Sequence, residues 1–193
     1  MAHTPAAGPG SSGLTGRAGR PRRDVTANAH RACVDLVRRQ GYAGTTLDQI
    51  AAAAGVAKTT LYRRWDSKAA LVLDALVGVL GEPPVQGEDR DAGLRTAVAW
   101  LAGRIADDAV HPLLAALVAE ASRDADLRAA LRAAIREPFE ARITAAWSLD
   151  PDSIDLAFDV AVGALLHRAA LTGAVDDATV QAIAEVAVSL ART

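Results

Sequence analysis

The sequence predicts an all-α protein of about nine helices, in which a small three-helix N-terminal module precedes a larger C-terminal helical module. Ala, Leu and Arg recur at spacings of three and four residues, which favours helix by both propensity and pattern. Val, Ile and Thr nowhere alternate with polar residues long enough to form a sheet. With 193 residues and 51% hydrophobic content, the chain can bury one or two cores.

The first three helices are expected at about residues 24–40, 47–54 and 58–65. Thr46 precedes an apolar run with helical spacing, so its hydroxyl can cap the second helix, and Gly55 can end that helix in a left-handed conformation. Leu61 and Trp65 are four residues apart and can bury one face of the third helix. Two short helices around a tight turn, the second with a basic outer face, are typical of a helix-turn-helix that binds duplex DNA.

A fourth helix, from Ser67 to about Leu80, is expected to join the two modules, and a double proline places a loop at about 81–87. The remaining helices are expected at about 89–108, 112–121, 124–147, 150–171 and 176–193. Pro138 lies inside one of them and should kink it, because proline removes a helical hydrogen bond.

The outward side chains of the third helix are candidates for DNA contact. Lys58, Thr59, Thr60 and Arg63 could reach base edges, because Arg suits guanine and the methyl groups of Thr suit thymine. Tyr62 is expected to hydrogen-bond a phosphate, although its ring could instead pack in the core. The alternative for the whole face is a solvated charged surface.

Charge is distributed unevenly along the chain. Residues 1–70 hold eleven basic and four acidic side chains, whereas the rest of the chain holds ten basic and nineteen acidic ones. The net charge of −2 therefore hides a basic module joined to an acidic one, and a basic face on one module attracts phosphates. Lys68 adds to this argument, because a cation in the first turn of a helix opposes the helix dipole unless an anion approaches.

The region from about 24 to 75 resembles the TetR family of bacterial transcriptional regulators. The positions that match the family pattern are Gly41, Tyr42, Thr45, Thr46, Ile50, Ala51, Gly55, Val56, Thr60, Leu61, Tyr62, Trp65 and Lys68. One departure is Ala57, where the family often has a Ser that caps the recognition helix or contacts a phosphate. The resemblance, taken with the charged face above, implies a DNA-binding set of Thr46, Lys58, Thr59, Thr60, Tyr62, Arg63 and Lys68.

The resemblance also implies that the C-terminal module binds a small effector and that its last two helices form a dimeric four-helix bundle. The expected function is a homodimeric repressor that a small apolar effector releases from double-stranded operator DNA. The alternatives are an activator, a regulator without an effector, or a ligand-binding protein with no role on DNA.

The C-terminal module mixes large rings with a few polar side chains, as an apolar cavity with polar anchors would. The candidate effector residues are Trp100, Arg104, His111, Trp147, Phe158 and His167, although ordinary core packing would explain most of them. Small residues in the helix at 150–171 would let a second copy approach closely; they are Ala157, Ala161, Gly163, Ala164 and Ala170.

Three domains are expected: a disordered basic arm at 1–22, a DNA-binding domain at 23–70, and an effector-binding and dimerisation domain at 71–193. The arm is rich in Gly, Pro and Ser and lacks the apolar segment of a signal peptide. Its Arg20, Arg22 and Arg23 could lie in the minor groove beside the helix-turn-helix, or could serve only solubility.

Several other classes of protein are not expected. A single cysteine, Cys33, allows no internal disulfide and most simply packs as a small hydrophobe, with redox sensing as the alternative. Asp107, Asp108 and His111 lack the further carboxylates that a helical metal site needs, so a helix end is the simpler interpretation. No nucleophile–base pair suggests an enzyme, and no cofactor is expected. No apolar stretch is long enough to span a membrane, and a cytoplasmic location follows.

Overall fold

The computed structural model describes residues 22–85 and 87–192, and side chains from Val25 onward. Within those ranges the chain forms ten α-helices and one π-helical turn, and no strand. The elements are α1 (Arg22–Gly44), α2 (Leu47–Ala54), α3 (Lys58–Tyr62), α4 (Lys68–Leu80), α5 (Arg90–Ile105), α6 (His111–Ala121), α7 (Ala125–Leu131), the π turn η1 (Arg132–Arg136), α8 (Glu137–Trp147), α9 (Pro151–Thr172) and α10 (Asp177–Leu190). The prediction of an all-α fold is confirmed.

The helix ends follow local chemistry. The Thr46 hydroxyl accepts the backbone N–H of Gln49 while the Gln49 side chain accepts the N–H of Thr46, a reciprocal cap for α2. Gly55 ends α2 with φ of 64°, a left-handed conformation that glycine adopts without strain. The α3 helix stops at Tyr62, short of the expected Trp65, and α1 continues past residue 40 to Gly44, with a kink at Gly41.

The helix expected at 124–147 is interrupted, as Pro138 predicts, but by a π turn. Since α7, η1 and α8 follow one another without a break, they together cover the single kinked helix that the sequence predicted. Pro138 is the second residue of α8 and has no N–H to offer the carbonyl of Ala134, which lies in η1. The wider π turn accommodates that loss, and such turns recur at functional sites.

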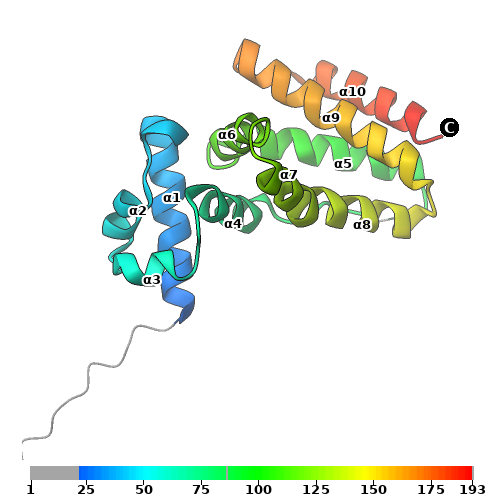
Figure 1. Cartoon of the computed structure of the whole chain (residues 1–193). Coiled ribbons are helices and arrows are strands. Elements are labelled where there is room, and N and C mark those ends of the chain that lie inside the picture. Colours follow the sequence, from blue (N-terminus) through cyan, green and yellow to red (C-terminus); the bar gives the residue numbers. More distant parts are fainter. Residues whose placement is uncertain (1–21, 86, 193) are drawn as a thin grey trace, which may run out of the picture.

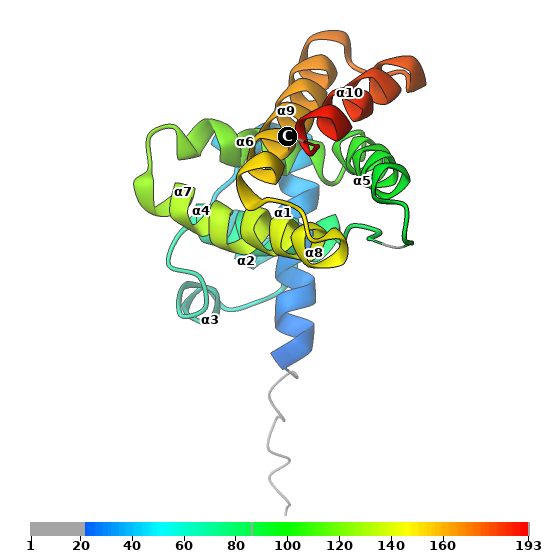
Figure 2. The same ribbon diagram turned by 90° about the vertical axis from the view of Figure 1, so that its right-hand side faces the viewer.

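Figures 1 and 2 show α1–α3 at one end of the molecule, α9 and α10 at the opposite end, and α4 leading from the first group to the second. One continuous apolar core extends from Ala29 in α1 to Ala187 in α10, and a smaller cluster lies beneath Trp147. None of the helices described here is long and apolar enough to cross a membrane.

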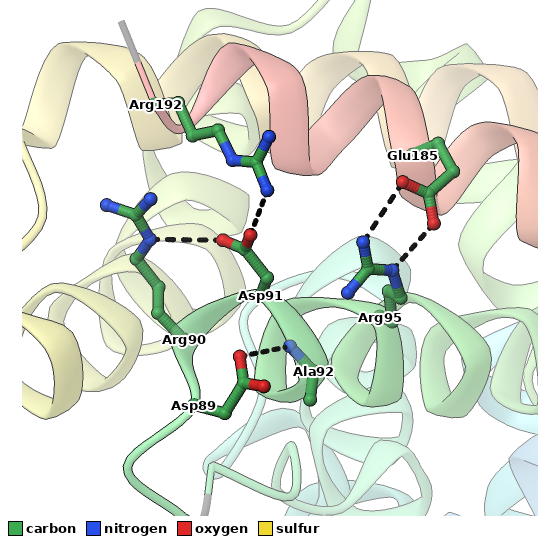
Figure 3. Close-up of polar contacts among 7 residues, drawn as sticks. All are labelled: Asp89, Arg90, Asp91, Ala92, Arg95, Glu185 and Arg192. Carbon is green, nitrogen blue, oxygen red and sulfur yellow. Dashed lines mark hydrogen bonds and ion pairs between the residues drawn. The ribbon is translucent and has the colours of Figure 1, made fainter.

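Ion pairs attach α10 to α5. Arg95 of α5 donates to both carboxylate oxygens of Glu185, over 2.6 and 3.1 Å, while Asp91 accepts from Arg192 beyond the end of α10 (Figure 3). The Arg192 guanidinium lowers the pKa of Asp91, and the Arg95 guanidinium lowers the pKa of Glu185. Both carboxyl groups are therefore held in the charged form that pairs with the arginines and attaches α10 to α5.

Candidate nucleic-acid interface and effector cavity

The third helix exposes one face and buries the other, as its sequence predicts. Leu61 is fully buried and Trp65, just after the end of α3, is 5% exposed, and both belong to the apolar core that includes residues of α1, α2 and α4. On the other side Lys58, Thr59 and Arg63 are exposed, and Thr60 is half-buried. Ala57 begins the helix and supplies no side-chain cap, which leaves the first N–H groups of α3 without a side-chain acceptor from this position.

The carboxylate of Asp48, in the first turn of α2, contacts two of the candidate DNA-binding side chains. Its Oδ2 accepts from Lys58 Nζ over 2.6 Å, and its Oδ1 accepts from the Tyr62 hydroxyl over 3.2 Å. The hydrogen bond from Lys58 lowers the pKa of Asp48, and the same bond raises the pKa of Lys58. Tyr62 is 48% exposed, so its ring lies at the surface rather than in the core.

Lys68 is engaged within the protein. Its Nζ donates to the Tyr42 carbonyl oxygen over 2.8 Å and lies 3.9 Å from the centre of the Tyr42 ring. These contacts join the end of α1 to the start of α4. The attachment offers a structural reason for a cation in the first turn of α4, beside the phosphate contact that the sequence suggested.

A second attachment lies further along α4. The Asp74 Oδ2 atom accepts from the indole N–H of Trp65 over 2.9 Å and lies 2.9 Å from His30 Nε2 of α1. The His30 and Trp65 rings also meet, with centroids 6.0 Å apart. The orientation of α4 is therefore tied to both the first helix and the segment after α3.

The basic arm cannot be placed. Arg20, and the side chains of Arg22 and Arg23, lie outside the described residues.

A cavity of about 350 Å³ lies between α4, α5, α6, α7, η1 and α9. Its lining is mostly apolar and comprises Leu80, Leu101, Leu114, Val118, Leu131, Arg132, Ile135, Arg136, Phe158, Asp159, Val162, Gly163 and Leu166. Of the six candidate effector residues, only Phe158 belongs to this lining.

The other five candidates lie elsewhere. Trp147 packs against Gly93 and donates its indole N–H to the Gly87 carbonyl oxygen over 3.0 Å. Trp100 stacks on Phe139 with ring centroids 6.2 Å apart. Arg104 lies 3.9 Å from Asp107, His111 begins α6, and His167 is exposed on α9.

Arg136 of the π turn stands at one side of the cavity and is surrounded by acceptors. Its guanidinium donates to Glu140 Oε1 over 2.6 Å, to Asp159 Oδ1 over 2.6 Å, and to the carboxylate and carbonyl oxygens of Asp155. Despite partial burial, which lowers it, these carboxylates raise the pKa of Arg136 above its usual range. Arg136 therefore joins η1 to α8 and α9 along the cavity wall, and its charge is already compensated.

The geometry gives little support to redox sensing or to a metal site. Burial raises the pKa of the Cys33 thiol to about 12, so the reactive thiolate is scarce at neutral pH. Among the residues that the structure describes, no group of three or more His, Cys, Asp or Glu side chains could hold a metal ion. Asp108 instead pairs with Arg38 over 3.2 Å.

Comparison with known proteins decides the family. The family model described as "Bacterial regulatory proteins, tetR family" matches residues 31–75. The "DNA-binding transcriptional repressor TetR" of Mycobacteroides abscessus is 32% identical over 157 residues, which span 75% of this chain and 82% of that relative. The chain belongs to the TetR family. It is accordingly a DNA-binding transcriptional regulator and not an enzyme.

Solved structures of transcriptional regulators share the fold along most of the chain. A TetR family transcription regulator with 28% identity superposes with a TM-score of 0.63 and covers 86% of this chain and 97% of its own. A transcriptional regulator from Streptomyces coelicolor A3(2), 22% identical, superposes with a TM-score of 0.68 over 88% of this chain and 99% of its own. The all-helical architecture with an N-terminal helix-turn-helix is thus that of a TetR regulator.

Asp48, Asp74 and Arg136 have contacts at these sites that sequence reasoning missed. Asp48 lies ten residues before Lys58, and no helical spacing connects the two because a turn separates them. The signal that could have found Arg136 is the pattern Arg136 and Glu140, four residues apart beside a helix-breaking proline.

Proposed function

We propose that this TetR regulator is a homodimeric repressor that binds a palindromic operator through α3 and leaves it when a small apolar effector enters the cavity. One observation carries the proposal: α4 contacts both sites. Lys68 at its start contacts α1, Asp74 in its middle holds Trp65, and Leu80 at its other end lines the cavity. A displacement of α4 by a ligand would therefore reorient α3. The relative named as a repressor supports the direction of control.

The proposed DNA contacts are the exposed side of α3 and the helix ends beside it: Thr46, Lys58, Thr59, Thr60, Tyr62, Arg63 and Lys68. The arm residues Arg20, Arg22 and Arg23 are proposed to enter the neighbouring minor groove. We keep the division into an arm at 1–22, a DNA-binding domain at 23–70 and an effector domain at 71–193 as part of the same proposal.

The lining of the cavity favours a largely apolar effector. The one guanidinium at its wall that makes several ion pairs, that of Arg136, is already bonded to three carboxylates. An anionic ligand that bound Arg136 would have to displace one of them, and Arg132 is the other guanidinium of the lining. Release also requires differential affinity, and a hundredfold loss of operator binding needs a preference of about 2.7 kcal/mol for the released arrangement.

Dimerisation is proposed through α9 and α10. Leu156 and Leu171 of α9 are 52% and 73% exposed, and Val186 of α10 is 49% exposed. Not all of the small residues expected at this interface are available to it. Ala157 and Ala161 are buried within the chain, and Gly163 lines the cavity. Ala164 and Ala170 remain for contact with a second copy.

The test begins with the DNA fragments that the protein retains from its own genome, which define an operator. Hydrophobic metabolites and drugs are then titrated while tryptophan fluorescence and operator binding are followed together. A compound that binds and releases the operator supports the proposal. A ligand that binds with no change in operator affinity contradicts it.

A matched pair of variants locates the effector site. Gly163 lines the cavity and Gly103 of α5 does not, yet a Cβ atom added at either position meets nothing within 4 Å. We expect Gly163→Leu to abolish the response to the effector and Gly103→Leu to preserve it. Equal responses in both variants would place the effector elsewhere.

A further inference from the structure

We propose that Asp48 is an internal competitor for DNA phosphate: its carboxylate occupies Lys58 and Tyr62 in the free protein and so weakens binding to duplex DNA of any sequence. The inference rests on the proposed DNA contacts at Lys58 and Tyr62, and it assigns Lys58, which the sequence analysis matched to base edges, to a phosphate instead. It concerns a carboxylate on α2 that belongs to neither the base-facing helix nor the cavity.

The geometry resembles that of a bound phosphate. One carboxylate presents two oxygens to two donors of different helical turns, Lys58 Nζ at 2.6 Å and the Tyr62 hydroxyl at 3.2 Å. Lys58 and Tyr62 are four residues apart on α3 and share one side of it. An oxygen of the DNA backbone that bound the same two donors would have to take the place of the carboxylate.

The contact contributes little to holding the fold together. The side chains of Lys58 and Asp48 are 63% and 48% exposed, and ion pairs in that setting add little to stability. Asp48 also favours the first turn of α2 through the helix dipole, but that effect needs no contact with Lys58. The main effect of the pairing is therefore on the ability of Lys58 to bind a ligand.

The electrostatic consequence is general. The pair of Lys58 and Asp48 has no net charge, so it neutralises little phosphate charge and releases few counterions from the DNA when the protein binds. Non-specific affinity comes almost entirely from phosphate contacts and counterion release, so a competitor at one lysine lowers it for every sequence. A regulator with such a competitor spends less time on random DNA.

The experiment measures the affinity of full-length Asp48→Asn for a random-sequence duplex and for a retained genomic fragment, over a range of salt concentrations. We expect both to be bound more tightly, by about fivefold or more for a dimer. The slope of log affinity against log salt should steepen by about one per subunit. Unchanged or weaker binding by a variant with the wild-type circular dichroism and melting temperature overturns the proposal.

Two further variants separate the causes. Asp126 is the second residue of α7, as Asp48 is of α2, and it is exposed, so Asp126→Asn makes the same change of charge in a matched position. An equal gain in Asp126→Asn would trace the effect to net charge and reject the competitor.

Lys58→Met tests the contact itself. The gain from Asp48→Asn should vanish in the Lys58→Met background, because the competition acts through that lysine. A gain that persists overturns the inference and leaves Lys58 as a DNA contact. If Lys58→Met alone leaves DNA affinity unchanged, it is the proposed contact at Lys58 that fails.

Discussion

Trp65 is the residue through which the end of the recognition segment is fixed to the rest of the chain. It is 5% exposed, and its indole N–H has Asp74 of α4 as acceptor. A buried donor without an acceptor is more costly than the bond itself is stabilising. The pair thus contributes to the stability of the DNA-binding end and, in the proposed mechanism, would transmit a movement of α4 to it.

We predict that Asp74→Ala lowers the free energy of unfolding by about 1–3 kcal/mol, because it leaves the Trp65 N–H without its acceptor. Urea denaturation followed by tryptophan fluorescence measures this. Asp74→Asn keeps an oxygen for the indole and should lose much less. If both variants lose the same amount, the negative charge beside His30 matters more than the acceptor.

Arg63 and Lys68 should fail in different ways. Arg63 is exposed on α3, so Arg63→Ala is expected to relax sequence preference at one or two operator positions. Lys68→Ala is expected to weaken binding to all sequences and lower the salt slope by about one per subunit. Affinities for single-base operator variants at several salt concentrations check both, and the same loss on operator and random DNA for both variants would contradict the division into base and phosphate contacts.

At the scale of elements, α5 is the helix against which the C-terminal part packs. Its first turns accept the Trp147 ring at Gly93 and pair with α10 through Arg95 and Asp91. Its Gly93 is buried, whereas Gly103 further along the same helix is exposed. One element therefore contains a glycine that packing requires and one that it does not.

Substitution of these two glycines should have opposite effects. A Cβ at Gly93 would overlap the Trp147 ring, so Gly93→Ala should destabilise the protein by about 1–3 kcal/mol. At Gly103 nothing lies within 4 Å of the added atom, and Gly103→Ala should stabilise by about 0.5–1 kcal/mol through helix propensity. Thermal denaturation of the two variants tests the pair, and a neutral Gly93→Ala would mean that Trp147 moves without cost.

The attachment of α10 to α5 should weaken in acid. Arg192 and Arg95 lower the pKa values of Asp91 and Glu185 in the folded protein. The stabilisation is therefore complete above the ordinary carboxylate pKa and is lost as the pH falls below about 4, through the folded-state values. Urea midpoints between neutral and acidic pH measure the loss. Arg95→Met with Glu185→Gln should show a shallower decline than the wild type, and an identical decline would assign the acid sensitivity to other groups.

At the scale of the whole molecule, the DNA-binding end and the proposed dimer face lie at opposite ends of the chain (Figures 1 and 2). One helix-turn-helix makes too few phosphate contacts for a specific complex. A dimer formed through α9 and α10 would present two copies of α3, and operator binding requires them about one helical turn of DNA apart, roughly 34–36 Å, or a little more. Dimerisation and operator binding should therefore be lost together.

We predict a salt slope of roughly −5 to −9 for operator binding, as expected if a dimer neutralises about six to ten phosphates. Leu171→Glu, which adds a charge at a position that is 73% exposed, should yield a folded monomer with a much shallower slope. Analytical ultracentrifugation and fluorescence anisotropy with labelled operator measure the two quantities. A monomeric variant that keeps the wild-type slope would show that one subunit suffices.

The sequence by itself determined the helical segments, the cap and turn of α2, and the buried side of α3, although α1 and α3 end at other residues than expected. The Thr46 cap, the turn at Gly55 and the spacing of Leu61 and Trp65 depend on residues within one or two turns of one another, so local propensity and periodicity suffice to predict them. The same local rules, together with the charge imbalance and the pattern around Tyr62, led to the family.

Only the tertiary structure decided which distant residues meet. Asp48 contacts Lys58 because the packing of α2 against α3 brings the two side chains together. Trp147 fills the space at Gly93, rather than lining a cavity, because α8 lies along α5. The cavity wall around Phe158 and the carboxylates around Arg136 likewise come from several helices. The type of a residue states what it can bond, but the crossing of helices determines its neighbours, and that crossing depends on the packing of the whole core.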